Sequence, residues 1–461
     1  MADYRRIADR IAADIGRGRL RPGQRLPPQR AFARRHGIAA STAGRVYAEL
    51  VRRGLVVGEV GRGTFVRATE PDPQPGHALT EAAGRVPVNL ELNYPSAPGQ
   101  AELLASALAP LLRPDALAEA LRPAAAAGTR AAREAAAGLL AAGGHRPDPD
   151  GVVFTGNARQ AVAATLASLV RPGGRVGVEP LTYPLVKEIA ARLGCTLVPL
   201  ATDERGPLPE SVAAAHRTAA LSALYLQPTL HNPTSLTLSA ERRAALAEVV
   251  HSLGIPVVED RIWSFLHQGG EPPLAALAPG LVHVVDGLSK RVAPGLTVGF
   301  VSAPADRAGA VVRAVRSGGW GAGGFALEAA VRWIGDGTVA RLADAKRRQA
   351  RRRQRLVARE LDGFAVRSDP AACFAWWELP SPWRADTFTA AARARGIAVT
   401  PGTAFSVDPK RTPSAVRLGL ASAEEPDLTR ALRILAELAR EGPGAGVGVG
   451  EGGTGGAVRG R

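Results

Sequence analysis

The chain has 461 residues, enough for a small domain followed by an enzyme-sized body. Hydrophobic residues make up 46% and charged residues 22%, as in ordinary globular proteins, and no apolar run is long enough to cross a membrane. The formal net charge is +16, and residues 1–68 hold 15 arginines against only five acids. This local excess of positive charge favours a polyanion such as nucleic acid as a partner.

The two cysteines, Cys195 and Cys373, lie in different apolar segments and suit a reducing compartment better than a disulfide framework. The first residues form an amphipathic pattern that includes acids, unlike a signal peptide. The sequence has no metal-binding spacing. We therefore expect a cytoplasmic protein without a bound metal.

The first helix is predicted where isoleucine recurs every four residues, at Ile7, Ile11 and Ile15. It should end near Gly16 or Gly18. A helix of about four turns with one apolar face is the expected first element.

A second helix should begin at Pro27-Pro28, because proline is tolerated in the first helical turn. Phe32 and Ala33 would face inward on it, and His36-Gly37 would end it. A second short helix is therefore expected after the first.

The third helix is predicted from Ala39 to Arg53, with Ser41 as its N-cap. Two short apolar runs, Leu55–Val57 and Thr64–Val66, flank a basic, glycine-rich turn and predict a β-hairpin. Three helices followed by a basic hairpin are the elements of a winged helix-turn-helix.

The motifs of this segment are G-x-L-x-P-G-x-x-L-P, then S-T-x-x-R-x-Y-x-x-L-x-x-x-G-L, then G-R-G-T-F-V. Over nearly all of residues 3–67 they resemble the DNA-binding domain of GntR-type bacterial regulators. The resemblance implies that the third helix enters the major groove and that the wing contacts the minor groove or backbone. It assigns operator DNA contacts to five residues: Arg30, Ser41, Thr42, Arg45 and Arg62. Relatives usually have an arginine where Ala40 stands, which leaves base readout to Arg45.

Two segments have the composition of flexible chain. Residues 69–88 are polar and proline-rich, which predicts a linker after the winged helix-turn-helix of residues 1–68. Residues 441–461 are largely glycine without an aromatic residue, and we expect this tail to be disordered.

Residues 89–440 alternate between helix-length segments and short apolar runs, which predicts an α/β fold with a mainly parallel sheet. The large lobe is expected at about residues 125–310, and a smaller α+β lobe is formed by the remainder. The expected strands lie near residues 152–154, 175–178, 197–200, 223–226, 256–258, 282–285 and 299–301. A basic helix from Arg341 to Arg359 has one apolar side, so we interpret it as a solvated linking helix and not as a second nucleic-acid site.

Lys290 is a candidate for chemistry because lysine is rare in this chain. Only four of the 58 basic residues are lysine, and arginine cannot form an imine with an aldehyde. Lys290 follows an apolar run, whereas Lys187, Lys346 and Lys410 have charged or loop-like neighbours. Desolvation would lower its pKa and favour the neutral amine that a Schiff base requires. Taken alone, an ordinary solvated lysine is an equal alternative.

Four further stretches follow predicted strands, where ligands bind in open α/β sheets. They are residues 155–161, 179–184, 231–234 and 259–260. The first of them opens a helix after a strand, and backbone N–H groups in that context bind phosphate.

In this order the stretches resemble fold-type I pyridoxal-phosphate (PLP) enzymes of the aspartate aminotransferase superfamily, over roughly residues 89–440. The resemblance implies that Lys290 forms the aldimine (Schiff base) with PLP and that Asp260 pairs with the pyridinium nitrogen. It also implies that Asn232 binds the ring 3-oxygen and that Tyr183 stacks on the ring.

The same resemblance assigns the charged groups of the ligands. The phosphate would rest on Ala158, Arg159 and Ser289. Arg417 matches the arginine that grips the α-carboxylate of an amino acid, and a planar guanidinium suits this bidentate contact.

Several positions depart from the aminotransferase pattern. Relatives often carry a phosphate-binding arginine where this chain has Thr297, and a serine where it has Gly287. A tyrosine expected near Asp260 is replaced by Ile262 and Trp263. Arg159 or Arg291 could substitute in binding the phosphate.

A winged helix ahead of such a body resembles the MocR subfamily of GntR regulators, which implies a head-to-tail homodimer. We expect a regulator that binds PLP through Lys290 and senses PLP or an amine or amino-acid effector. The alternatives are an aminotransferase that retains turnover and a regulator whose body has lost the cofactor and serves only for dimerisation.

Overall fold

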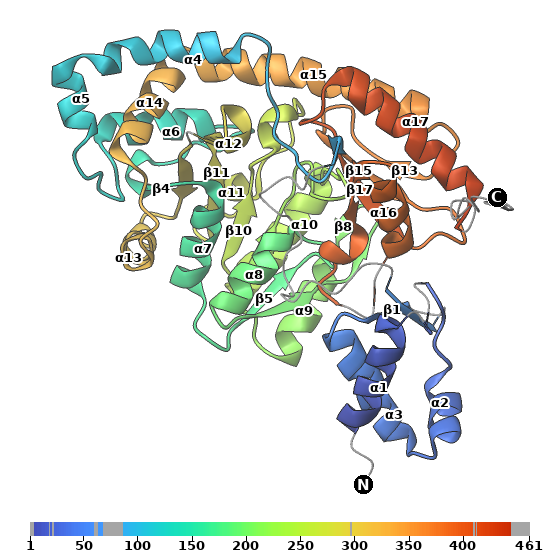
Figure 1. Cartoon of the computed structure of the whole chain (residues 1–461). Coiled ribbons are helices and arrows are strands. Elements are labelled where there is room, and N and C mark those ends of the chain that lie inside the picture. Colours follow the sequence, from blue (N-terminus) through green and yellow to red (C-terminus); the bar gives the residue numbers. More distant parts are fainter. Residues whose placement is uncertain are drawn as a thin grey trace, which may run out of the picture.

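The computed structural model describes most of the chain in three parts, namely a small N-terminal domain, a large α/β body and a smaller lobe (Figure 1). The described residues are 4–17, 19–20, 23–59, 63–67, 86–295, 297–408, 411 and 413–443. The wing residue Arg62, most of the predicted linker and most of the predicted tail lie outside them. No helix within the described ranges has both the length and the apolar character needed to cross a membrane.

The N-terminal domain is a winged helix-turn-helix. Its elements are α1 (Tyr4–Gly16), α2 (Gln29–His36), α3 (Ala40–Arg52), β1 (Val56–Glu59) and β2 (Gly63–Val66). The two strands pair antiparallel, with Val57 opposite Phe65. Phe32 and Ala33 are buried in its core, as their inward position in the predicted second helix requires.

The prediction that Ser41 caps α3 is wrong. The helix begins one residue earlier, and its N-cap is Ala39, which makes no side-chain hydrogen bond. Ser41 therefore lies within the first helical turn, where it is exposed to solvent.

A seven-stranded sheet forms the centre of the large body. Its spatial order is β4 (Val152–Thr155), β12 (Gly299–Ser302), β11 (Val282–Gly287), β10 (Val257–Asp260), β9 (Ala223–Leu226), β5 (Arg175–Val178) and β6 (Thr196–Pro199). β12 runs antiparallel to both neighbours, and the other pairs are parallel. The mainly parallel sheet predicted from the apolar runs is confirmed.

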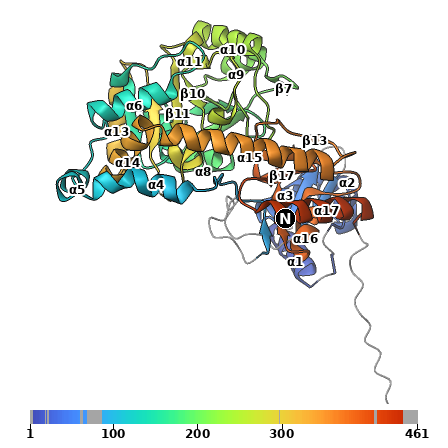
Figure 2. The same ribbon diagram turned by 90° about the horizontal axis from the view of Figure 1, so that it is seen from above.

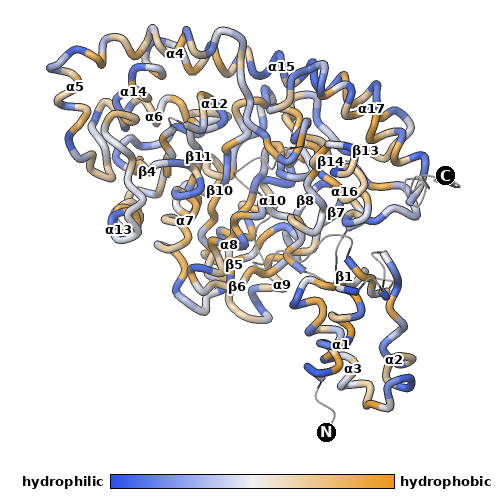
Figure 3. Tube along the Cα trace, in the orientation of Figure 1, coloured by the Kyte–Doolittle hydropathy of each residue, from blue (hydrophilic) through white to orange (hydrophobic). Residues whose placement is uncertain are grey.

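Both faces of this sheet are covered by helices, which explains why its strands are continuous apolar runs (Figure 3). Successive strand residues such as Val257 and Val258 belong to separate hydrophobic clusters on opposite faces. One face packs against α6 (Arg130–Leu140), α9 (Pro209–Thr218), α10 (Ala240–Leu253), α11 (Leu274–Leu277) and α14 (Gly324–Gly335). The other packs against α7 (Ala158–Leu169), α8 (Pro184–Arg192) and α13 (Ala308–Gly318).

The smaller lobe has an antiparallel sheet covered by helices. The sheet order is β13 (Val366–Arg367), β14 (Phe374–Glu378), β17 (Ala415–Gly419) and β16 (Thr400–Pro401). The covering helices are α16 (Ala385–Ala394) and α17 (Glu425–Glu441). β3 (Val88–Asn89) pairs with β15 (Ile397–Ala398), so Val88, the last residue of the predicted linker, already belongs to this lobe. Outside these layers lie α4 (Gln100–Leu108), α5 (Pro114–Ala120) and the hairpin of β7 (Thr202–Asp203) and β8 (Gly206–Pro207).

The long basic helix α15 (Thr338–Glu360) runs from the large body to the smaller lobe (Figure 2). Its interpretation as a mainly solvated linking helix is incomplete, because Lys346 and Arg353 on it are buried. Their charged ends reach backbone carbonyls of both lobes, which replace water as hydrogen-bond partners.

The winged helix-turn-helix contacts the smaller lobe through β2. The guanidinium of Arg384, at the N-terminus of α16, lies 4.1 Å from the centre of the Phe65 ring. Arg384 is buried by this contact and by its own pairing with Asp386.

Candidate functional site

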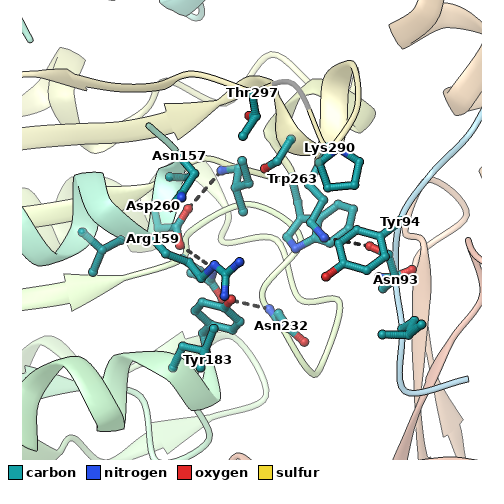
Figure 4. Close-up of a pocket in the computed structure, with 18 of the residues that line it drawn as sticks. Asn93, Tyr94, Asn157, Arg159, Tyr183, Asn232, Asp260, Trp263, Lys290 and Thr297 are labelled. Atoms are coloured by element: carbon teal, nitrogen blue, oxygen red, sulfur yellow. Dashed lines mark hydrogen bonds between the residues drawn. The ribbon is translucent and has the colours of Figure 1, made fainter. Parts of the chain in front are cut away.

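A pocket of about 1070 Å³, including its opening to solvent, lies where the strand ends of the large body face the smaller lobe (Figure 4). All eight residues predicted to bind cofactor or effector line it: Ala158, Arg159, Tyr183, Asn232, Asp260, Ser289, Lys290 and Arg417. Polar residues spread over about 260 positions of sequence therefore meet in one cavity.

Lys290 projects into this pocket from α12 (Leu288–Arg291) and is surrounded by aromatic rings. Its Nζ donates to the carbonyl oxygen of Asn93 at 2.8 Å and lies 4.2 Å from the Tyr94 ring and 5.2 Å from the Trp263 ring. Burial first, and then the nearby Arg417, lower the pKa of Lys290 to about 7. A substantial fraction of the neutral amine is therefore present near neutral pH.

Asp260, at the end of β10, is held by three hydrogen-bond donors. Tyr225 Oη donates to it at 2.6 Å, Gln227 Nε2 at 2.9 Å and the backbone N–H of Ile262 at 3.0 Å. Burial raises the pKa of Asp260 even though these donors favour the carboxylate. The arrangement fixes a carboxyl group that can pair with a cationic ring nitrogen.

The N-terminus of α7 provides a cradle for an anion. The Asn157 side chain caps the helix by accepting from Gln160 N at 3.0 Å, and Thr155 Oγ1 donates to the Asn157 carbonyl at 2.9 Å. The next N–H groups, of Ala158 and Arg159, belong to the helix end at which the dipole favours negative charge.

The two departures around the predicted phosphate site have structural explanations. A Cβ built on Gly287 would lie 2.9 Å from the carbonyl oxygen of Val298, so a serine has no room there. The Thr297 hydroxyl is buried at the pocket without a hydrogen-bond partner in the described part of the chain. It can donate to a bound anion.

Arg291 does not substitute for a phosphate ligand, although the sequence suggested it. Its guanidinium pairs with the buried carboxylate of Asp286 at 2.5 Å and lies 5.1 Å from the Phe265 ring. It is not among the residues lining the pocket, whereas Arg159 is.

Two more lining residues carry buried polar atoms without a recorded partner in the described chain. Asn232 donates its backbone N–H to Gln227 Oε1 at 3.2 Å, and its own side-chain oxygen is unpaired. Arg417 donates to Thr400 Oγ1 at 3.1 Å and to the carbonyl of Glu91, while its Nε is unpaired.

Arg417 forms no ion pair with an acidic side chain of the described residues, and burial lowers its pKa to about 10. A buried guanidinium of this kind is matched by a carboxylate ligand. Together with Asn232, Thr297 and the α7 N-terminus, it makes the pocket fit a group with a phosphate, a ring hydroxyl and an adjoining carboxylate.

Sequence reasoning missed several pocket residues. Asn93 and Tyr94 lie on a segment without a recognisable motif, far from Lys290 in sequence. Gln227 was not considered, although its place directly after β9 was a usable signal. Tyr225, which supports Asp260 without lining the pocket, looked like ordinary strand core.

Four of the five predicted DNA-contact residues lie on α2 and α3, and the fifth, Arg62, lies outside the described residues. Arg30, Ser41 and Arg45 are exposed, and Thr42 is partly buried beside them. The Arg45 guanidinium also lies 5.9 Å from the centre of the Tyr4 ring of α1. The described part of the winged helix-turn-helix thus presents an exposed polar face on the predicted recognition helix.

A mainly parallel seven-stranded sheet with one antiparallel strand and a lysine at its carboxyl edge defines the fold-type I PLP-dependent class. The chain belongs to the family of class I and II aminotransferases, whose profile matches residues 100–435. The profile of the gntR family of bacterial regulatory proteins matches residues 3–66. The chain therefore joins a GntR-type helix-turn-helix to an aminotransferase body, and PLP is the cofactor of that body.

Known proteins resemble the chain over most of its length. The chain is 29% identical to the HTH-type transcriptional regulator YdeF of Bacillus subtilis over 94% of each chain. It is 27% identical to the HTH-type pyridoxine biosynthesis transcriptional regulator PdxR of Corynebacterium glutamicum, over 76% of this chain and 77% of that protein. An archaeal alanine:glyoxylate aminotransferase superposes with a TM-score of 0.71 at 21% identity, over 78% of this chain and 92% of that one.

Proposed function

We propose that the protein is a DNA-binding transcriptional regulator of the MocR type, in which the aminotransferase body binds PLP and senses PLP or an amine or amino acid. The observation that carries this proposal is that one chain presents an exposed face of α3 and also gathers seven other predicted ligand-binding residues in the pocket of Lys290. Relatives such as YdeF, matched over 94% of each chain, and TauR of Rhodobacter capsulatus, matched over 68% of this chain, are named as transcriptional regulators, which supports it.

The residues that would hold PLP follow from the pocket. Lys290 supplies the amine, Asp260 pairs with the ring nitrogen, Asn232 binds the ring hydroxyl and Tyr183 covers the ring. The phosphate would be bound at the α7 N-terminus by Ala158 and Arg159, with Ser289 and Thr297 at its other side. When bound, PLP supplies an aldehyde that condenses with amines.

Arg417 selects an effector that carries a carboxylate. Its guanidinium belongs to β17 of the smaller lobe, whereas Lys290 belongs to the large body. An amino acid that reached both residues would connect the two lobes, and its binding would favour one lobe arrangement over another.

DNA binding in the cytoplasm is assigned to α2, α3 and the wing, with contacts from Arg30, Ser41, Thr42, Arg45 and Arg62. We propose a head-to-tail homodimer, so that two recognition helices meet two half-sites of an operator.

The cofactor part of the proposal is tested by absorbance. Purified protein mixed with PLP should develop a visible band that is absent in Lys290→Ala. If the parent protein develops no such band, the alternative is favoured in which the aminotransferase body has lost the cofactor and serves only for dimerisation.

The regulatory part is tested by binding to the promoter next to the gene. Affinity should fall steeply with salt and change when PLP or an amine is added. Absence of DNA binding with and without these ligands would contradict it.

A second function is supported by the completeness of the pocket, because Lys290, Asp260, Asn232 and Arg417 all line it. The protein would then be an aminotransferase with an accessory DNA-binding domain. Steady transamination that is lost in Lys290→Ala would favour this function over regulation alone.

A further inference from the structure

We propose that Lys346 is a positioning residue for Lys290, holding the helix that carries Lys290 from the side opposite the pocket. The inference rests on the proposed role of Lys290 in binding the cofactor. Lys346 itself does not line the pocket.

The contact is between one ammonium group and the end of one short helix. Lys346 Nζ donates to the carbonyl oxygens of Lys290 at 3.1 Å, Arg291 at 3.0 Å and Val292 at 2.6 Å. An ammonium has three N–H donors, so these three carbonyls satisfy it completely. The last carbonyls of a helix have no partner within it, and a cation there also meets the negative end of its dipole.

α12 needs such an external hold because it has only four residues, from Leu288 to Arg291. Its end is followed by a segment in which Pro294 and Gly295 are exposed. The side chain of Arg291 ties the same helix to Asp286 of β11. Lys346 and Asp286 therefore hold α12 to α15 and to the central sheet.

The burial of Lys346 indicates a specific role. The residue is 1% exposed, and it forms no ion pair with any acidic side chain among the described residues. Burial lowers its pKa to about 8, so the ammonium remains the main form at neutral pH. A buried cation without a carboxylate partner is unfavourable unless its hydrogen bonds are complete, as they are here.

Arginine could not make this contact, although it is far more frequent in the chain. Its planar guanidinium spreads its donors in a fixed fork, whereas three carbonyls that converge on one point require a compact ammonium. Lys187 also donates to backbone carbonyls, those of Ala404 and Ser406. Three converging acceptors, however, are given only to Lys346 among these two lysines.

Lys346 also acts on Lys290 through its charge. The cations that lower the pKa of Lys290 are Arg417 of β17, Arg159 of α7 and Lys346 of α15, and Cys373 opposes them. Removing the Lys346 charge should therefore raise the pKa of Lys290. Without its three hydrogen bonds from Lys346, the end of α12 should also hold the Lys290 amine less precisely for the cofactor.

The test uses the full chain labelled with ¹³Cε-lysine, which gives four lysine signals because the chain has four lysines. The Lys290 signal is assigned by its loss in Lys290→Ala, and its titration is followed without PLP in the parent, Lys346→Met and Lys187→Met. We expect the pKa of Lys290 to rise in Lys346→Met and to stay unchanged in Lys187→Met, which removes a partly buried ammonium that also donates to backbone carbonyls. An unchanged Lys290 titration in Lys346→Met, or an equal shift in both variants, overturns the proposal.

PLP affinity gives an independent readout from the visible band. Lys346→Met should bind PLP roughly tenfold more weakly or worse, since misplacing a reacting amine has an effect of this order. Lys187→Met should bind it like the parent. If Lys346→Met does not fold, Lys346→Arg keeps the charge without the three-way geometry and should also bind PLP more weakly. A folded Lys346 variant that binds PLP as tightly as the parent contradicts the inference. A parent protein that binds no PLP contradicts the proposed function, and the inference is then tested by the lysine titration alone.

Discussion

Lys290 combines a low pKa with a surrounding of carbonyl and aromatic groups. The Asn93 carbonyl and the Tyr94 ring stabilise its ammonium, whereas burial and Arg417 favour the neutral amine. Because the pKa is lowered to about 7, the effects that favour the neutral amine are the larger ones.

This balance makes the stability of the unloaded protein depend on pH. The unfolded chain has an ordinary lysine pKa near 10.5, so between about pH 7 and 10.5 it binds a proton that folded Lys290 does not hold. Folding stability should therefore rise with pH across this window. Lys290→Met removes this proton uptake, so its stability gain over the parent should be larger at pH 7 than at pH 10. Thermal unfolding at both pH values checks this, and an equal difference at both would contradict it.

At the residue scale, the motifs predicted side chains that meet in one pocket, because most of them follow a strand whose apolar run can be recognised. Asn93 and Tyr94 could not be predicted in this way, since the smaller lobe brings their segment to Lys290 through long-range packing. The burial of Lys346 was hidden for the same reason, because its sequence neighbours are charged while its partners lie more than 50 residues earlier.

At the scale of elements, the close approach of the backbones of β11 and β12 limits which side chains can reach the predicted phosphate site. Gly287 is the last residue of β11, and the backbone of β12 passes too close for a side chain. Thr297 stands just before β12 and has the unpaired hydroxyl.

Gly287→Ser should destabilise the protein and should not strengthen PLP binding. The new Cβ would lie 2.9 Å from the Val298 carbonyl, and relieving such overpacking costs about 1–3 kcal/mol. Chemical denaturation and a PLP titration measure the two effects. A serine variant with parental stability and tighter PLP binding would refute this account of the site.

Thr297→Val should separate affinity from stability. Valine removes a buried hydroxyl that lacks a partner, so the unloaded protein should be no less stable. Loss of one hydrogen bond to the phosphate should weaken PLP binding by roughly two- to tenfold. Unchanged PLP affinity would show that the hydroxyl does not reach the phosphate.

Element boundaries were predicted where local chemistry decides them. Gly37 ends α2 with a positive φ of 59°, the conformation for which glycine is favoured. The start of α3 was misjudged because Ala39, which has no capping side chain, occupies the N-cap, so local capping preference did not decide the boundary.

At the scale of the whole molecule, one cation–π contact joins the DNA-binding domain to the lobe that carries Arg417. Arg384 and Phe65 make this contact, with Gly23 of the N-terminal domain close to Thr387 of α16. Burial lowers the pKa of Arg67, the neighbouring arginine at the end of β2, in agreement with a closed interface.

Arg384→Ala should release the DNA-binding domain from the smaller lobe. A contact of this kind contributes about 1–2 kcal/mol when it is desolvated, enough to shift a docking equilibrium severalfold. Small-angle scattering should then give a larger radius of gyration than for the parent. Arg395→Ala, at the other end of α16, is the matched control and should scatter like the parent. Identical profiles for Arg384→Ala and the parent would disprove the role of this contact.

The replacement of lysine by arginine also sets how the charge of the protein can be regulated. Residues 1–68 contain no lysine, and the whole chain has four. Lysine acetylation could therefore neutralise at most four of its 58 basic side chains and none in the DNA-binding domain. Lysine acetylation therefore cannot weaken the attraction of that domain to a phosphate backbone, whereas added salt does.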